Sequence, residues 1–198
     1  MIDYFYPPQP KRLWPDSPYL SKLCKNPLWD AEIKYNGWRL LIFVDNIIKL
    51  YNRHGTIIDI NAKVFHGFFK KIPSDTIFDA ELINFRTKDI KNTIVIFDTV
   101  YYHGQDLKRK PLSERRKYLD HFMTAPSSLY SEQPQVFKIQ QFSTNFIDLY
   151  NTIINRNDPI EEGIVIKQKT SIYRSHVSRG IEINDWLKIR KIGDHAKV

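Results

Sequence analysis

A series of short apolar segments, separated by turn-forming pairs, constrains the fold of this chain more than any other feature. The segments cover residues 29–35, 39–44, 47–51 and 56–60, and the separators are Asn36-Gly37, Asp45-Asn46 and His54-Gly55. Such pairs favour the tight turns that join antiparallel strands. The pattern therefore predicts an antiparallel β-meander over residues 29–60.

The rest of the chain alternates between helical and strand-like patterns. Apolar residues recur at helical spacing over residues 61–72, 112–123 and 144–154, with Pro73 as a stop and Thr144 as a candidate N-cap. Strand-like segments lie at residues 76–84, 93–100, 135–142, 163–168 and 183–189. Because strands outnumber helices and most are joined as hairpins, the predicted fold class is α+β with mainly antiparallel sheets.

The first 28 residues differ in composition from the rest. They hold six of the eleven prolines, which remove backbone donors and disfavour both helix interiors and central strands. We expect residues 1–28 to form an extended arm on a single globular domain of residues 29–198. The side chains expected to fix the arm are Tyr4, Tyr6, Leu13 and Trp14.

The charge and the cysteine content narrow the partners and the compartment. A net charge of +8 favours an anionic partner, and nucleic acid is commoner among such partners than a membrane surface. The single cysteine, Cys24, excludes an intramolecular disulfide and a cysteine-rich zinc site. Without a signal-peptide pattern or an apolar run of about 18 residues, we expect an intracellular protein of the cytoplasm, nucleus or nucleoid that binds no membrane.

Lys34 stands at the end of a strand-like segment, directly before a glycine turn. A lysine can act as a nucleophile when burial or neighbouring cations lower its pKa, but a solvated lysine at a turn shows the same local pattern. The sequence has no glycine-rich phosphate loop. Further charged segments follow in order: "YNRHG" at 51–55, "FDAEL" at 78–82, "IVIFDTVYY" at 94–102, "EEGIVIK" at 161–167 and "DWLKIR" at 185–190.

Taken together, these segments resemble those of the covalent lysine nucleotidyltransferases. "KYNGWR" at 34–39 is similar to the K-x-D-G-x-R motif, "FDAEL" to D-G-E-L, "IVIFDTV" to the adenine-stacking strand, "EEGIVIK" to E-G-[IV]-[VM]-x-K and "DWLKIR" to W-x-K-x-K. Within that family, "AEIKY", "YNRHG", "FDTVYYHGQDL" and "PLSERRKYL" most resemble ATP-dependent DNA ligases. The resemblance implies an ATP-grasp-like nucleotidyltransferase domain of two packed, mainly antiparallel sheets flanked by helices.

The resemblance also implies roles for individual residues in binding ATP. Lys34 would take AMP onto its amine, while Lys188 and Arg190, which a strand places on one face, would neutralise the α-phosphate. Glu32 would accept a hydrogen bond from the adenine amino group, and Phe97 would stack on the ring. The full nucleotide-binding set is Glu32, Ile33, Lys34, Arg39, Glu81, Phe97, Lys167 and Lys188.

A metal ion and DNA are the other implied ligands. Glu162 and Glu81 would support Mg²⁺, for which carboxylate oxygens are suitable ligands, and Asp98 and Asp79 are weaker candidates. Arg53 would engage the 5′-phosphate at a nick in double-stranded DNA. A basic helix face, formed by Arg115, Arg116 and Lys117, would follow backbone phosphates or would simply be solvated.

Several positions depart from the pattern of the family. Asn36 stands where aspartate is usual, Ala80 replaces a glycine and Arg190 replaces a lysine. Only Lys191–Val198 follow the last strand, so we expect no C-terminal OB-fold domain within this sequence, and a separate accessory chain could supply one. We expect slow reaction with ATP, and sealing of a nick that is already adenylated.

The leading hypothesis is the adenylation domain of an ATP-dependent DNA ligase, which forms a lysine-AMP intermediate and seals nicks. An RNA ligase or an mRNA-capping guanylyltransferase would use the same scaffold. A protein of a different class, an inactive relic that only binds nucleic acid, is a further alternative.

Overall fold

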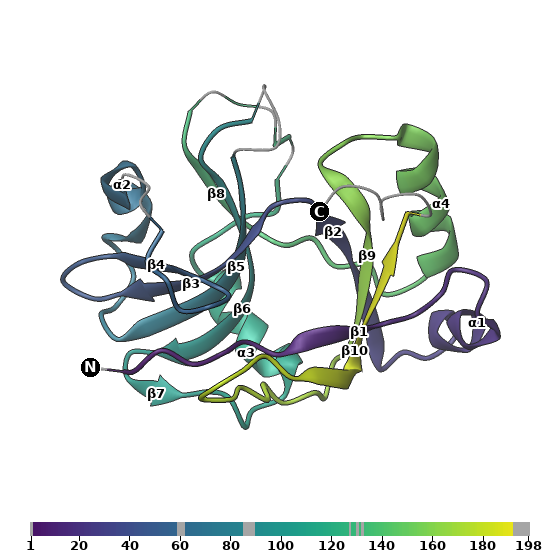
Figure 1. The fold of residues 1–198 in the computed structure, drawn as a ribbon, viewed down its shortest axis with the longest axis horizontal. Coiled ribbons are helices and arrows are strands. Elements are labelled where there is room, and N and C mark those ends of the chain that lie inside the picture. Colours follow the sequence, from purple (N-terminus) through teal and green to yellow (C-terminus); the bar gives the residue numbers. More distant parts are fainter. Residues whose placement is uncertain are drawn as a thin grey trace.

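Two β-sheets form the body of the protein. The computed structural model describes residues 2–58, 62–84, 90–126, 128–129, 131 and 133–191. The two sheets stand side by side, and the N-terminal arm runs beneath both of them (Figure 1). Most strand pairs are antiparallel, and the described helices are short. This arrangement confirms the predicted α+β class with two mainly antiparallel sheets.

The first sheet has four strands. In spatial order they are β1 (Gln9–Arg12), β10 (Glu182–Arg190), β9 (Glu161–Gln168) and β2 (Trp29–Tyr35). One face of this sheet is apolar and is covered by α1 (Pro18–Cys24) and α4 (Phe146–Arg156). Side chains alternate along a strand, so the polar residues of β2, β9 and β10 share the opposite face.

The second sheet has six strands. The order is β4 (Lys49–Asn52), β3 (Trp38–Val44), β5 (Thr76–Ile83), β6 (Thr93–Tyr102) and β7 (Gln105–Asp106), and β8 (Gln135–Lys138) lies parallel to β6. The short 3₁₀ turn Ala62–Phe65 and α2 (His66–Phe69) supply Phe65 and Phe69 to its apolar core. Helix α3 (Leu112–Asp120) packs against β6.

The predicted meander over residues 29–60 is wrong at its first turn. β2 pairs with β9 of the first sheet, whereas β3 pairs with β4 and β5 of the second sheet. Asn36-Gly37 is therefore a crossing between sheets and not a hairpin turn. The crossing passes so close to β5 that a Cβ atom on Gly37 would lie 2.3 Å from the Leu82 carbonyl oxygen.

Some predicted elements are shorter than expected. The helical pattern of residues 61–72 gives only a 3₁₀ turn and one short α-helix, which contains the poor helix former Gly67. The strand predicted at 56–60 is reduced to a bridge between Tyr51 and Ile57, and residues 59–60 lie outside the described part. Helix α4 begins after Asn145, which adopts a left-handed conformation with φ 57°, so Thr144 is not its cap.

The N-terminal arm is extended over its first part, as predicted. It also contains a strand and a helix, which its high proline content did not predict. β1 pairs in parallel with β10. The Tyr4 hydroxyl donates a hydrogen bond to the main-chain carbonyl of Asn52, at the end of β4 in the second sheet. Helix α1 begins with Pro18 at its first turn and Ser17 as its N-cap, which are favoured positions for both residues. Trp14 is 55% exposed, so its predicted packing role is wrong.

Among the described residues, no helix is both long and apolar enough to cross a lipid bilayer.

Candidate nucleotide-binding site

Lys34 lies in a row of residues that crosses three neighbouring strands. In register, Lys34 on β2 is opposite Gly163 on β9, and Gly163 is opposite Arg190 on β10. In the next row, Val165 on β9 lies between Glu32 on β2 and Lys188 on β10. Because opposite residues of antiparallel strands point to the same side of a sheet, both rows lie on the polar face, the one opposite α1 and α4.

A β-bulge brings Glu162 to Lys34. The register runs from Lys34–Gly163 directly to Tyr35–Glu161, so Glu162 is an extra residue on β9. Its carboxylate forms an ion pair with Lys34 Nζ, and Arg190 Nη2 lies 3.7 Å from Glu162 Oε1.

Gly163 allows the three strands to approach each other at this bulge. It has a φ of +146°, and a Cβ atom there would lie 1.9 Å from the Ile189 carbonyl oxygen. The positive φ and the close approach of β10 therefore require a glycine at this position of the "EEGIVIK" segment.

Cations crowd the region around Lys34. Burial lowers the pKa of Lys188, and the charges of Arg190 and Lys34 lower it further, whereas Glu182, 3.8 Å away, raises it. Such mutual repulsion is relieved when an anion binds among the cations. This group of side chains fits a phosphate.

The second sheet carries Arg39 and Glu81 opposite each other on β3 and β5, and the carboxylate that binds Arg39 is that of Asp79. Arg39 binds Asp79 through two bonds, Nε–Oδ1 at 2.9 Å and Nη2–Oδ2 at 2.5 Å, and it donates from Nη1 to the Pro8 carbonyl at 2.7 Å. The Tyr173 hydroxyl also donates to Asp79. Asp79 therefore orients Arg39 and is not free to ligate a metal.

Glu81 points toward the crossing between the sheets, where it accepts the Gly37 N–H at 3.0 Å. Burial raises the pKa of Glu81 to about 7; the charges of Lys34 and Arg39 oppose the rise, and that of Glu162 adds to it. Glu81 and Glu162 are therefore close enough for their charges to repel each other, and Glu162 is in contact with Lys34. A cation between them would relieve their repulsion.

These two carboxylates fit a magnesium ion that is also held by phosphate oxygens and water. Mg²⁺ in nucleotide sites commonly takes only one or two protein carboxylates. Within the described ranges, no group of three or more histidine, cysteine or acidic side chains is arranged to hold a metal alone. The donor set therefore fits a metal that arrives with a nucleotide better than a permanently bound ion.

Glu32, Lys167 and Phe97 meet at the buried end of the site. Lys167 Nζ lies 2.8 Å from Glu32 Oε2 and 4.5 Å from the centre of the Phe97 ring. Phe97 is the extra residue of a second bulge, since Asp79 is opposite Asp98 but the next pair is Ala80–Ile96. Phe97 packs in the same apolar cluster as Val95, two residues earlier, and the bulge brings the next residue, Asp98, opposite Asp79, which periodicity alone cannot reveal.

Ile33 can reach the site only through its main chain. Its side chain packs among apolar residues on the face opposite that of Lys34. Ala31, two residues earlier, directs its N–H and carbonyl to Phe142 beyond the outer edge of β2. By the period of two along a strand, the main-chain groups of Ile33 point to that same edge.

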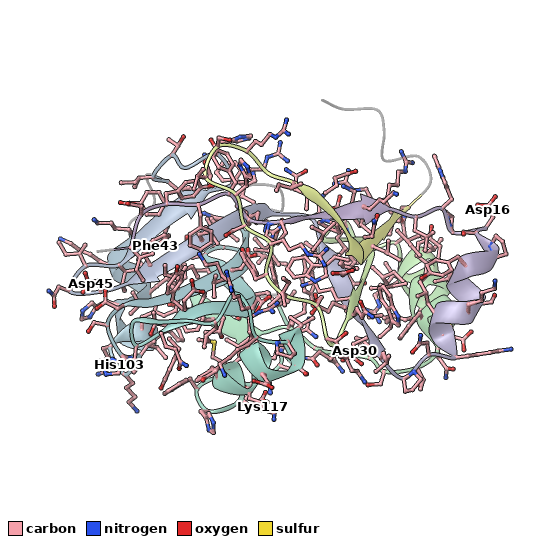
Figure 2. All side chains as sticks on the ribbon, turned by 90° about the horizontal axis from the view of Figure 1, so that it is seen from below. Asp16, Asp30, Phe43, Asp45, His103 and Lys117 are labelled. Carbon is pink, nitrogen blue, oxygen red and sulfur yellow. The ribbon has the colours of Figure 1, made fainter. Side chains whose placement is uncertain are left out.

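The predicted DNA-binding face of α3 is wrong for two of its three residues. Arg115 is completely buried and binds Asp98 through bonds of 2.8 and 2.7 Å, which also removes Asp98 as a metal candidate. Arg116 is 4% exposed and forms an ion pair with Glu32. Only Lys117 of the three is exposed, at the periphery of the molecule in Figure 2.

The sequence contained the signal for this burial. Four residues of α3, spaced i, i+3, i+4 and i+7, form one helical face and are all buried: Leu112, Arg115, Arg116 and Leu119. Two arginines at inward positions indicate buried ion pairs, because a buried guanidinium requires a carboxylate partner.

Arg53 lies in the turn that follows β4. It is exposed, and its Nε donates to His54 Nε2 at 3.0 Å. The Tyr6 hydroxyl contacts the His54 carbonyl, so the arm supports this turn. The position leaves the guanidinium accessible to an anion.

Comparison with known proteins shows which family the chain belongs to. A model described as ATP dependent DNA ligase domain matches residues 81–190, more than half of the chain. The SPbeta prophage-derived DNA ligase-like protein LigB of Bacillus subtilis (strain 168) is 32% identical over 199 residues, a match that covers 87% of this chain. The chain spans 66% of the length of that relative.

Solved structures show the same fold. Mycobacterial DNA ligase D complexed with ATP and MES superposes with a TM-score of 0.68 at 17% identity, over 94% of this chain and 60% of that chain. A structure of Lig E DNA ligases superposes with a TM-score of 0.64 at 13% identity, over 96% and 70%. Since the matched residues carry the end of β5, all of β6 to β10 and the Glu162–Lys167 segment of the site, this chain belongs to the ATP-dependent DNA ligase domain family.

Proposed function

We propose that this chain transfers AMP from ATP to Lys34, then to the 5′-phosphate at a nick in double-stranded DNA, and finally seals the nick. The observation that carries the proposal is the three-strand row of Lys34, Gly163 and Arg190, with Glu162 beside it. A nucleophilic amine next to a surplus of cations is what attack on a phosphate requires.

The first step forms one bond and breaks one. The Lys34 amine attacks the α-phosphorus of ATP, a P–N bond forms, and the bond to the pyrophosphate oxygen breaks with its electron pair leaving on pyrophosphate. Glu162, in contact with Nζ, can accept the proton that the amine gives up. Lys188 and Arg190 stabilise the charge that builds on the phosphate oxygens.

The next two steps pass AMP to the DNA and then release it. A 5′-phosphate oxygen attacks the same phosphorus, a P–O bond forms, and the Lys34 amine leaves. The 3′-hydroxyl across the nick then attacks the 5′-phosphate, and AMP leaves as the phosphodiester forms. Magnesium bound by Glu81 and Glu162 would supply charge compensation on the phosphates during these steps.

The remaining site residues would hold the nucleotide and the DNA. Phe97 and Glu32 suit the base, and Glu81 suits a ribose hydroxyl because a carboxylate accepts its hydrogen bond. Arg39, held by Asp79, is oriented for the ribose or phosphate. Arg53 and the net charge of +8 support binding of the DNA backbone. We also propose that the protein acts inside the cell.

The asparagine at position 36 is compatible with this role. Its Nδ2 donates to the Pro159 carbonyl at 3.2 Å, and its own N–H donates to the Ile160 carbonyl. An aspartate could not make the side-chain donation. Asn36 therefore fastens the crossing after Lys34 to the segment that leads into β9.

A nick-sealing assay tests the proposal. The protein is incubated with magnesium and a DNA duplex whose nick already carries AMP on its 5′-phosphate, and the same nick made in RNA serves as the comparison. We expect sealing of the DNA nick and at least tenfold loss in Lys188→Ala, since one charge-stabilising contact contributes about that much or more. No sealing of either nick would contradict the proposal, and preferential sealing of RNA would favour an RNA ligase.

A further inference from the structure

The buried guanidinium of Arg116 on α3 has no role in the chemistry described above. Burial of a cation is costly unless a specific partner compensates it. Arg116 is 4% exposed, and its partner is Glu32, which is 2% exposed and lies on the other sheet. Arg116 Nε also lies 3.4 Å from the main-chain carbonyl of Phe97.

Arg116 thus connects two residues that come from different sheets. Glu32 belongs to β2 of the first sheet and Phe97 to the bulge on β6 of the second sheet. Under the proposed function, these are the residues that contact the edge and the face of adenine. The α3 arginine spans the gap behind them, so it fixes the position of the acceptor relative to the stacking ring.

Lys167 contacts the other carboxylate oxygen of Glu32, Oε2, at 2.8 Å, so Glu32 lies between two buried cations. Burial lowers the pKa of Lys167 well below its usual value, and the Arg116 and Arg39 charges lower it further, against the opposing effects of Asp98 and Asp79. Burial lowers the pKa of Arg116 only to about 10, with Asp30 and Asp120 opposing the decrease. With a pKa of about 10, Arg116 stays charged at neutral pH in its ion pair with Glu32.

We infer that Arg116 is a positioning residue for base recognition: it holds Glu32 as an ionised acceptor for the 6-amino group of adenine, at a fixed place relative to Phe97. This role rests on the proposed function. It makes discrimination among purine nucleotides depend on α3, through an arginine that acts on the base only by way of Glu32.

Equilibrium binding of ATP and of purine riboside triphosphate, which lacks only the 6-amino group, tests the role. Both are measured by calorimetry in EDTA, where no transfer occurs. We expect the wild-type protein to prefer ATP, and we expect Arg116→Met to reduce that preference about tenfold, since a hydrogen bond to a charged group is lost. Arg116→Lys, which keeps a cation there, should retain the preference within about threefold of wild type.

Two controls separate positioning from simple loss of structure. Lys117→Met removes the neighbouring exposed cation of α3 and should leave both affinities unchanged. In a Glu32→Gln background, Arg116→Met should alter the preference by less than about twofold, because the two residues act as one unit. If Arg116→Met does not fold, Arg116→Gln, which also removes the charge but keeps a polar side chain, replaces it in the same cycle.

The outcomes distinguish the two proposals. If wild type prefers ATP and Arg116→Met loses affinity for both nucleotides equally, or keeps the preference in full, Arg116 is only structural and the inference is overturned. If wild type binds neither nucleotide, the proposed function fails first, and the role of Arg116 fails with it.

Discussion

Single residues create the site by interrupting regular strands. Glu162 and Phe97 are each the extra residue of a β-bulge, one on β9 and one on β6. The bulge on β9 turns Glu162 out of the normal alternation, so that its carboxylate contacts Lys34. At the bulge on β6, the Phe97 ring lies 4.5 Å from Lys167 Nζ. At Gly163 the main chain adopts a conformation that other residues rarely reach.

Gly163 therefore has a larger effect on stability than its size suggests. Gly163→Ala places a Cβ atom against the Ile189 carbonyl at positive φ, so we expect a loss of at least about 2 kcal/mol of unfolding free energy in urea. Gly67→Ala on α2, where a Cβ would meet nothing within 4 Å, is the matched control. It should stabilise the protein by up to about 1 kcal/mol; equal effects of the two substitutions would contradict this account.

Glu81 makes stability depend on pH. Its folded-state pKa is about 7, against an ordinary value of 4.5. As pH rises between these values, the unfolded chain releases the proton while the folded chain retains it, so folding is progressively penalised. The penalty is absent below the lower value and constant above the higher one.

Glu81→Gln, which can still accept the Gly37 N–H, removes this titration. Its stability advantage over wild type should grow from near zero at about pH 4 to at most about 3 kcal/mol at about pH 7.5. Urea unfolding of both proteins at a series of pH values measures it. An advantage that is constant across that range would show that burial does not raise the pKa of Glu81.

At the scale of elements, the two sheets owe their arrangement to pairings that are distant in sequence. β2 pairs with β9, and β1 pairs with β10. The crossing at Asn36-Gly37 sends the chain from one sheet to the other, and α1 and α4 close the outer face of the first sheet. The arm is therefore part of the sheet and not an appendage.

The start of α1 offers a test of how firmly the arm is fixed. The Ser17 side chain caps the helix by accepting the Tyr19 N–H at 3.3 Å. Ser17→Ala should cost about 1 kcal/mol of unfolding free energy. Ser21→Ala, at an exposed position within the same helix, should change it by less than about 0.5 kcal/mol or slightly stabilise the protein. If the two serines prove equivalent in thermal unfolding, the cap contributes nothing.

The sequence predicted the elements better than their partners. Periodicity located most strands, because alternation reports burial on one face. It carries no information about which strand lies alongside, so the turn after Lys34 was interpreted as a hairpin. Motif order identified Lys34, Glu162, Lys188 and Arg190 as one site. The basic run at 115–117 has the charge of an exposed face but the helical spacing of a buried one, and the structure places Arg115 and Arg116 in buried ion pairs.

At the scale of the whole molecule, the site lies where the two sheets face each other and the arm joins them. The Pro8 carbonyl binds Arg39 of the second sheet, while β1 continues the first sheet. Tyr4 and Tyr6 contact the turn that carries Arg53. The arm thus links the turn proposed to bind DNA with the residues proposed to bind the nucleotide.

Binding of DNA should depend on salt and on Arg53. We expect affinity for a nicked duplex to fall as salt rises, because phosphate contacts release counterions. Arg53→Ala should weaken binding to a nick with a 5′-phosphate more than to the same nick with a 5′-hydroxyl. Lys22→Ala on α1, at the far end of the molecule from β4 (Figure 1), is the matched control. Equal losses for both nicks would mean that Arg53 does not contact the 5′-phosphate.

The most direct test of the central claim is the detection of AMP on Lys34. The protein is incubated with magnesium and ATP, its intact mass is measured, and the modified peptide is identified after digestion. We expect a mass gain of one adenylyl group, located on Lys34, which pyrophosphate reverses and which Lys34→Ala abolishes while Lys22→Ala retains it. An adduct that persists in Lys34→Ala, or its absence from wild type even after prolonged incubation, would contradict the assignment of Lys34 as the nucleophile.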